Sequence, residues 1–258
     1  MIGLSDKQLK EKAPAIFATE PAEFVSENYK FVSTNRIIDE FRNLDFIPTD
    51  AQQVRYRDDK EKMVGKHIVR LRHKDLATPR DVGESIPEIV LVNGHGWQTS
   101  YKLLGAIFRM ICSNGMIVSD QEFGNLKQLH KGFDPEDIVT ASKEFLTSTA
   151  KTFKKVETFQ SIDLDKKEIM KFGREAARLR WDDAGDLFAE QVLQPRRQAD
   201  MGDNLWLVMN RCQESLVRGG FENPHTERLV RPITGITADL DLNERLWNLT
   251  EQFAHRLN

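Results

Sequence analysis

The spacing of apolar residues changes along the chain, and this change limits the possible folds more than any other feature. Apolar and charged residues alternate in "AQQVRYRD" (51–58) and "KHIVRLRHK" (66–74), and "IPEIVLVN" (86–93) is a continuous apolar run. Alternation places every second side chain on one face of a strand. From residue 134 onward apolar residues recur every three or four positions, which is the period of an amphipathic helix. The sequence therefore predicts strands first and helices afterwards.

We expect the two alternating segments to pair as a β-hairpin with Gly65 in the connection. The apolar run at 86–93 predicts a buried strand at the centre of the same sheet. Two helices are expected before the hairpin, one capped by Ser5 and one capped by Ser33 or Thr34. A further helix is expected after the apolar run, over 98–111, because its apolar residues fit a helical stripe.

Together these patterns predict an α+β protein, with an antiparallel-dominated sheet and a basic β-hairpin in the N-terminal half and a mostly helical C-terminal half. The change in pattern places a boundary near 121–134. The two regions would be 1–125 and 126–258, or they would form one continuous domain. A chain of 258 residues is long enough for either arrangement.

The predicted hairpin is basic although the whole chain carries a net charge of −3. Residues 52–80 contain nine Lys or Arg and four Asp or Glu, a local charge of +5. Pairing Val54 and Tyr56 with Val69 and Leu71 would place the alternating arginines together on the other face. Like charges across a sheet destabilise it mildly, whereas guanidinium groups bind phosphates through two hydrogen bonds. We therefore expect phosphate contacts from a group of six residues, Arg55, Arg57, Lys66, Arg70, Arg72 and Lys74. The alternative is a solvated face neutralised by acidic neighbours.

The turn Asn93-Gly94-His95-Gly96 follows the apolar run. Two glycines beside one imidazole are typical of a backbone-rich turn whose N–H groups can bind an anion. A ligand pocket would combine Asn93, His95 and Arg109, with His95 as a base or a ligand contact. We favour the alternative, a strand-to-helix turn with a structural histidine. The spacings of glycine-rich nucleotide-binding motifs do not occur.

The remaining motifs give no sign of a cofactor or a zinc site. The acidic runs "WDDAGD" (181–186) and "DLDLNE" (239–244) are typical of solvated loops or helix caps, and a magnesium ion held by their carboxylates is the less favoured alternative. The six histidines lack the paired spacing of zinc ligands, and no Cys-x-x-Cys occurs. Cys112 is expected at a helix C-terminus, where the helix dipole raises a thiol pKa. No apolar run reaches the ~20 residues of a membrane span, and the N-terminus does not resemble a signal peptide. We expect a cytoplasmic protein whose thiols, Cys112 and Cys212, are reduced and which does not bind membranes.

Seven segments, in order from residue 4 to 247, resemble the bacterial phage/plasmid-like proteins grouped as a domain of unknown function. They are "LSDKQLKEKAPAIFA", "YKFVSTNRIIDEF", "KHIVRLRHKD", "IPEIVLVNGHG", "YKLLGAIFRMICSNGMIV", "NRCQESLVRGG" and "NERLW". The resemblance implies a mobile-element protein but no activity. The family's turn has the form Asn-Ser-His-Asp/Asn, and this chain has glycine on both sides of His95. This departure weakens a catalytic role for the turn.

The order helix, β-hairpin, buried strand, helix is similar to the core of phage recombination annealing proteins such as Redβ and Erf. That similarity implies a homo-oligomer that binds or anneals single-stranded DNA in phage or plasmid recombination. One alternative is an anti-defence protein whose acidic helices bind and block a host protein. A second alternative is an enzyme with a site near His95 and Arg109. We favour a protein without catalytic activity and leave the question open.

Overall fold

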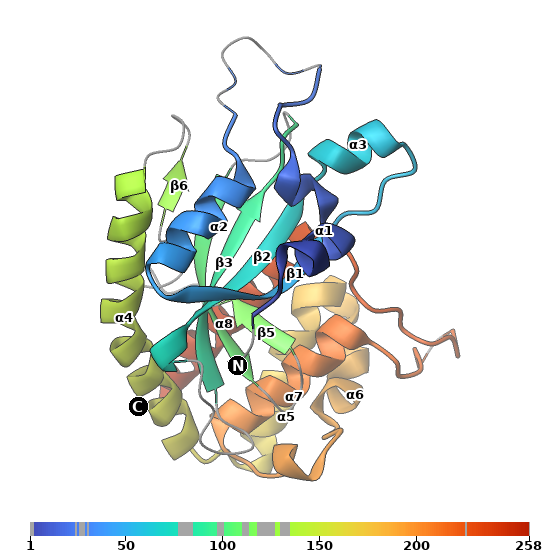
Figure 1. The fold of residues 1–258 in the computed structure, drawn as a ribbon. Helices are drawn as coiled ribbons and strands as arrows, with labels where there is room; N and C mark the ends of the chain where they lie inside the picture. The colour runs from blue at the N-terminus through green and yellow to red at the C-terminus, as the bar shows by residue number, and fades with distance from the viewer. Residues whose placement is uncertain are drawn as a thin grey trace. The chain divides into compact units, whose positions relative to one another are not determined.

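The computed structural model describes residues 3–23, 25, 29, 31–76, 85–96, 101–109, 114–117, 127–129, 135–224 and 226–257. The chain forms two compact units. Unit 1 comprises Met1–Met110 and Asp120–Thr149, and unit 2 comprises Ile111–Ser119 and Ala150–Asn258. The N-terminal half contains an antiparallel sheet and the C-terminal half is mostly helical, so the α+β prediction is confirmed (Figure 1). None of the described helices has both the length and the apolar content of a membrane span.

The sheet of unit 1 is an antiparallel meander in which consecutive strands are neighbours. A short strand, β6, pairs with the start of β4. The strand predicted from the continuous apolar run is β3, which lies between β2 and β4 and whose Ile89, Val90 and Leu91 are fully buried. This confirms the prediction of a central buried strand. The strands are β1 (Phe46–Gln53), β2 (His67–His73), β3 (Ser85–Asn93), β4 (Tyr101–Arg109) and β6 (Lys127–Leu129).

The first hairpin lies earlier in the sequence than the alternating pattern predicts. β1 ends at Gln53, which pairs with His67, so residues 54–58 follow the strand. Val69 pairs with Ala51 and Leu71 with Pro48, which makes the predicted pairing with Val54 and Tyr56 wrong. The pattern hid β1 because "FIPTDAQQ" does not alternate: it contains a proline and an irregular register between Pro48 and Asp50.

Residues 101–109 form strand β4 and not the predicted helix. The segment fits both periods, because Tyr101, Leu103 and Ile107 share one face of a strand and are buried there. The free edge of β3 decides between them, because its buried N–H and C=O groups need a partner strand. Tertiary pairing therefore overrides a plausible helical pattern.

Short helices pack against the sheet of unit 1. They are α1 (Asp6–Lys12), the 3-10 helix η1 (Pro14–Phe17) and α2 (Thr34–Asn43) (Figure 1). The predicted caps are confirmed, since the side chain of Ser5 accepts from Gln8 N and that of Ser33 from Arg36 N. Phe41 of α2 packs edge-on against Phe46 of β1, with ring centroids 5.3 Å apart. The helix α3 (Asp59–Val64) and the 3-10 turn η2 (Lys74–Leu76) flank β2 in sequence.

The long helix α4 (Pro135–Ser161) begins in unit 1 and ends in unit 2. Unit 2 confirms the predicted helices, whose core includes Phe172, Trp247 and Phe253. Helix α7 (Leu205–Arg218) ends at Gly219-Gly220. Gly219 has φ 58°, and a Cβ there would collide with the carbonyl oxygen of Val230. The other elements are β5 (Asn114–Ile117), α5 (Lys166–Trp181), η3 (Asp182–Phe188), α6 (Ala189–Leu193), η4 (Gln198–Asp200), α7 (Leu205–Arg218) and α8 (Ile236–Leu257).

Candidate nucleic-acid interface

The six basic residues predicted to share one face occupy different environments. Arg55 and Arg57 are exposed in the connection between β1 and α3, and Lys66 is half-buried just before β2. Arg70 and Arg72 are buried within β2. The last of the six residues is Lys74, which follows β2 and forms an exposed ion pair with Asp45 at 2.7 Å. The structure therefore brings Arg70 close to Arg72 and keeps Arg55 and Arg57 outside the sheet.

Arg70 and Arg72 share one buried carboxylate, that of Glu88 on β3. The Nη1 of Arg70 donates to Oε1 of Glu88, and the Nε of Arg72 donates to Oε2 at 3.1 Å. Glu88 is 0% exposed, and the two arginines are 7% and 6% exposed. Like charges at alternate positions of β2 are tolerated because an opposite charge lies between them in the neighbouring strand. These arginines therefore stabilise the sheet, and we leave them out of the candidate interface.

Tyr56 lies between the two exposed arginines and is itself 38% exposed. Its ring rests against the backbone of Gly65, where an added Cβ would come within 2.5 Å of Cε2 of the ring. Neither Arg55 nor Arg57 forms an ion pair with any described residue. The segment 55–57, which we call the cationic arm, therefore presents an aromatic ring supported from behind and flanked by two guanidinium groups.

Two lysines lie at the same end of the sheet as the cationic arm. Lys66 accepts a backbone hydrogen bond from Val54 N at 2.9 Å, next to the arm. Val92 pairs with both Ile68 and Lys102, so β2 and β4 direct Lys66 and Lys102 to the same face. Burial lowers the pKa of Lys66, and the nearby positive charge of Lys102 lowers it further. A bound anion would offset the repulsion between the two lysine side chains. Sequence reasoning missed Lys102 because it placed a helix there.

The residues around the predicted turn form a buried hydrogen-bonded chain. Nδ2 of Asn93 donates to Oγ1 of Thr34 at 2.9 Å, and Thr34 Oγ1 lies 2.8 Å from Nε2 of His67. His67 Nδ1 lies 2.8 Å from the carbonyl oxygen of Gly65. A carbonyl can only accept, so His67 carries its proton on Nδ1 and accepts from Thr34 through Nε2. Burial lowers the pKa of His67 to about 3, so the ring is neutral at neutral pH.

His95 is 0% exposed and holds the turn in place. Its Nε2 lies 2.8 Å from the carbonyl oxygen of Ala15, so Nε2 is the protonated nitrogen. Its backbone N donates to the carbonyl of Val64, and its carbonyl accepts from Ala22 N, both at 2.9 Å. Burial lowers the pKa of His95 as well. These contacts tie three segments together and leave the imidazole out of reach of solvent.

The structure does not bring Arg109 to this turn. The backbone of Arg109 pairs with Ser85 at the start of β3, whereas Asn93 is the last residue of that strand. Eight residues of strand separate the two ends by roughly 26 Å. The side chain of Arg109 lies outside the described residues. Asn93 and His95 lie close to each other. Both side chains are buried, and each is hydrogen-bonded to a backbone carbonyl oxygen.

Among the residues that the structure describes, no group of three or more His, Cys, Asp or Glu is arranged to hold a metal ion. Cys212 is buried, and its burial raises the pKa of the thiol to about 12. Such a thiol is inert as a nucleophile at neutral pH. Cys112 lies outside the described residues.

Comparison of the sequence with known proteins identifies the family of this chain. Residues 21–247 match the family model described as Domain of unknown function (DUF932). The chain is 30% identical to the UPF0380 protein YfjQ of Escherichia coli (strain K12), over 98% of this chain and 93% of that protein. The UPF0380 protein YafZ of the same strain shows the same identity and coverage. No solved structure matches the chain. The chain belongs to the DUF932 family, which confirms the resemblance to a family of unknown function.

Proposed function

We propose that this DUF932 family member binds single-stranded nucleic acid through the cationic arm, with Lys66 and Lys102 beside it. The observation that carries the proposal is the exposed ring of Tyr56, which is supported by Gly65 and flanked by Arg55 and Arg57. The exposed cations contact phosphates, and the ring stacks on a base.

The arrangement favours a single strand over a duplex for a physical reason. The bases of a duplex are stacked on each other, so their flat faces are not open to a protein side chain. A single strand exposes these faces, and stacking on an aromatic side chain stabilises binding by about 1–3 kcal/mol per base. Guanidinium groups on both sides of Tyr56 can hold the phosphates next to the stacked base.

The biological setting is part of the same proposal. A protein that holds single strands could anneal them during phage or plasmid recombination, and annealing would call for a homo-oligomer. The imidazole of His95 is buried and hydrogen-bonded to the carbonyl oxygen of Ala15, so its environment does not favour catalysis there.

Fluorescence anisotropy with a labelled strand of about 40 nucleotides tests the proposal. The titration is made at about 50 mM and about 200 mM salt, beside a duplex of the same sequence. We expect tighter binding to the single strand and a marked loss of affinity at the higher salt. Absence of single-strand binding even at the lower salt would exclude the proposed function.

A further inference from the structure

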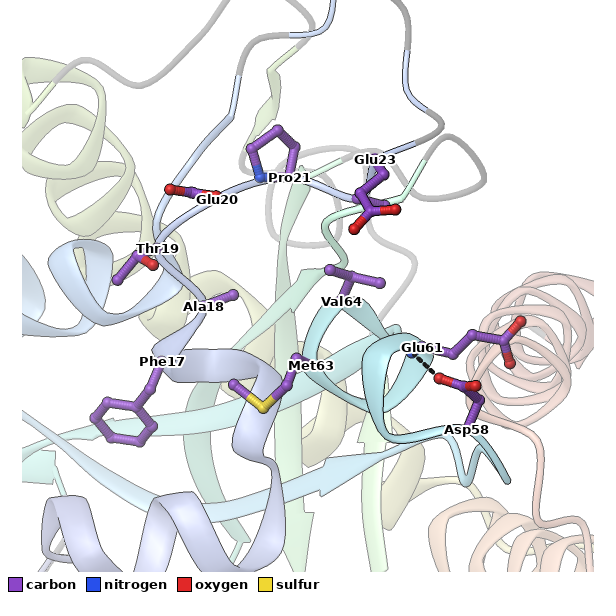
Figure 2. Close-up of a pocket in the computed structure, with 11 residues that line it drawn as sticks. Phe17, Ala18, Thr19, Glu20, Pro21, Glu23, Asp58, Glu61, Met63 and Val64 are labelled. Atoms are coloured by element: carbon purple, nitrogen blue, oxygen red, sulfur yellow. Dashed lines mark hydrogen bonds between the residues drawn. The ribbon is translucent and has the colours of Figure 1, made fainter.

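A cavity of about 540 Å³ lies between the segment from Phe17 to Glu23 and helix α3 (Figure 2). Its wall is largely apolar and includes Met63 and Val64 of α3. Figure 2 shows Glu20 and Glu23 on the segment that includes Pro21, and Asp58 and Glu61 at the start of helix α3. The described residues that line it include four carboxylates and neither lysine nor arginine. The cavity therefore suits a group that is cationic and partly apolar.

The acidic cavity and the cationic arm are adjacent on the surface of unit 1. Arg57 is followed directly by Asp58, whose Oδ1 accepts from Glu61 N at 3.3 Å at the start of α3. Glu20 and Glu61 are exposed and form no ion pair with any described residue. Glu23 and Asp58 make other polar contacts, so Glu20 and Glu61 are the carboxylates available to a cationic group.

Apolar side chains are exposed on both sides of this boundary. Tyr56 in the arm is 38% exposed, and Met63 at the cavity is 39% exposed. Neighbouring patches of opposite charge, each with an exposed apolar side chain, are complementary to themselves under a two-fold rotation. In such a pair, the arm of each copy faces the cavity of the other.

We infer that two copies of this chain associate through a two-fold interface in which the cationic arm of each enters the acidic cavity of the other. Arg57 then pairs with Glu61 of the second copy, and Tyr56 is covered beside Met63. Charge complementarity orients the two copies, and burial of the apolar side chains adds stability. A contact made by one short arm and one cavity should be weaker than a standard interface of roughly 1,600 Å². We therefore expect association in the micromolar range that weakens with salt.

The inference does not rest on the proposed function, because it uses only the charges and exposure of the described residues. It does connect the two, since a nucleic acid and a second copy would compete for Arg55 and Arg57. A single strand that binds the arm therefore dissociates this two-fold pair, and an annealing oligomer would form through another surface. Self-association without nucleic-acid binding would refute the proposed function alone, and absence of this two-fold pair in a protein that binds nucleic acid would refute the inference alone.

Sedimentation velocity of the full chain, over concentrations up to about 100 µM and at low and physiological salt, measures the association. The variants are Arg57→Glu, Glu61→Arg and the two together. We expect each single reversal to raise the dimer dissociation constant at least about tenfold, because it places like charges opposite each other. The double reversal restores opposite charges across the two-fold axis and should recover most of the affinity. Lys143→Glu reverses the charge of an exposed residue of α4 that does not line the cavity, so it serves as the control.

Three outcomes would overturn the inference. The first is a wild-type protein that stays monomeric at the highest concentration and lowest salt. The second is a dimer unaffected by both single reversals, which would place the interface elsewhere. The third is a double reversal no better than the single ones, which would mean that Arg57 and Glu61 do not pair. Circular dichroism of each variant establishes that the fold is intact.

Discussion

Two pairs of arginines with the same local pattern have opposite roles in this protein. Arg55 and Arg57 flank a tyrosine, and Arg70 and Arg72 flank a leucine, so both pairs look like one face of a strand. Arg70 and Arg72 are buried on Glu88, whereas Arg55 and Arg57 are exposed and form no ion pair with any described residue. The difference lies in the neighbouring chain. A carboxylate on the adjacent strand makes two arginines part of the buried sheet, and a connection without such a partner among the described residues leaves the other two exposed.

The largest expected effect tests the buried pair. Glu88→Gln replaces the buried carboxylate that Arg70 and Arg72 share with a neutral amide. We expect a loss of about 3–5 kcal/mol in the free energy of unfolding. Urea unfolding followed by circular dichroism measures it. Asp45→Asn, which breaks the exposed ion pair with Lys74, is the control and should leave the midpoint unchanged. Equal midpoints for wild type and Glu88→Gln would show that the shared carboxylate does not stabilise the sheet.

A fall in pH should lower the free energy of unfolding through the buried His67. The pKa of His67 is lowered from 6.5 to about 3 by burial. An unfolded chain takes up this proton near pH 6.5 and the folded chain does not. The stability from His67 is therefore complete above pH 6.5 and is lost as the pH falls toward 3. At pH 5 the loss is about 2 kcal/mol from this residue.

Unfolding free energies measured between about pH 7.5 and pH 5 check this linkage. In His67→Gln the dependence on pH should be shallower, whatever the stability of the variant itself. His255→Gln changes an exposed residue of α8 and is the control. If the free energy of unfolding of His67→Gln depends on pH as steeply as that of the wild type, then the environment of His67 in the folded protein, including its contact with Thr34, does not keep the imidazole neutral.

Substitution of the exposed arginines should change nucleic-acid binding and not stability, whereas the change at the buried pair affects stability. Arg55→Ala combined with Arg57→Ala should weaken single-strand binding at least about tenfold and lower the salt dependence by about one unit per arginine. The urea midpoint should not change, because both side chains are exposed. Lys143→Ala removes an exposed cation of α4 and is the matched control. Wild-type affinity in the double variant would separate the arm from nucleic-acid binding.

The smallest expected effect concerns the ring between the two arginines. Tyr56→Ala should cost about 1–3 kcal/mol of single-strand affinity through lost stacking. Tyr56→Phe keeps the ring and should keep most of the affinity. Anisotropy titrations of both variants, beside the duplex, separate stacking from charge, since neither substitution alters the net charge at neutral pH. If Tyr56→Ala and Tyr56→Phe bind equally well, the ring does not stack on a base.

Much of the candidate interface was within reach of the sequence. The basic segment follows from composition, although the sequence did not show which of its arginines are exposed. The structural role of His95 agrees with the interpretation that we favoured. Lys102 could not be found, because its place beside Lys66 depends on a strand register that only the folded sheet defines. The separation of Arg109 from His95 depends on the same register.

Local features of the sequence determined the helices, their caps at Ser5 and Ser33, the stop at Gly219 and the central strand β3, because each depends on residues within a few positions of one another. The tertiary structure alone decided that residues 101–109 form a strand and that Glu88 takes up Arg70 and Arg72. Those outcomes depend on hydrogen bonds and charges supplied by another strand, such as the pairing of Lys102 with Val92 and the contact of Arg72 with Glu88. A local pattern contains no information about such partners.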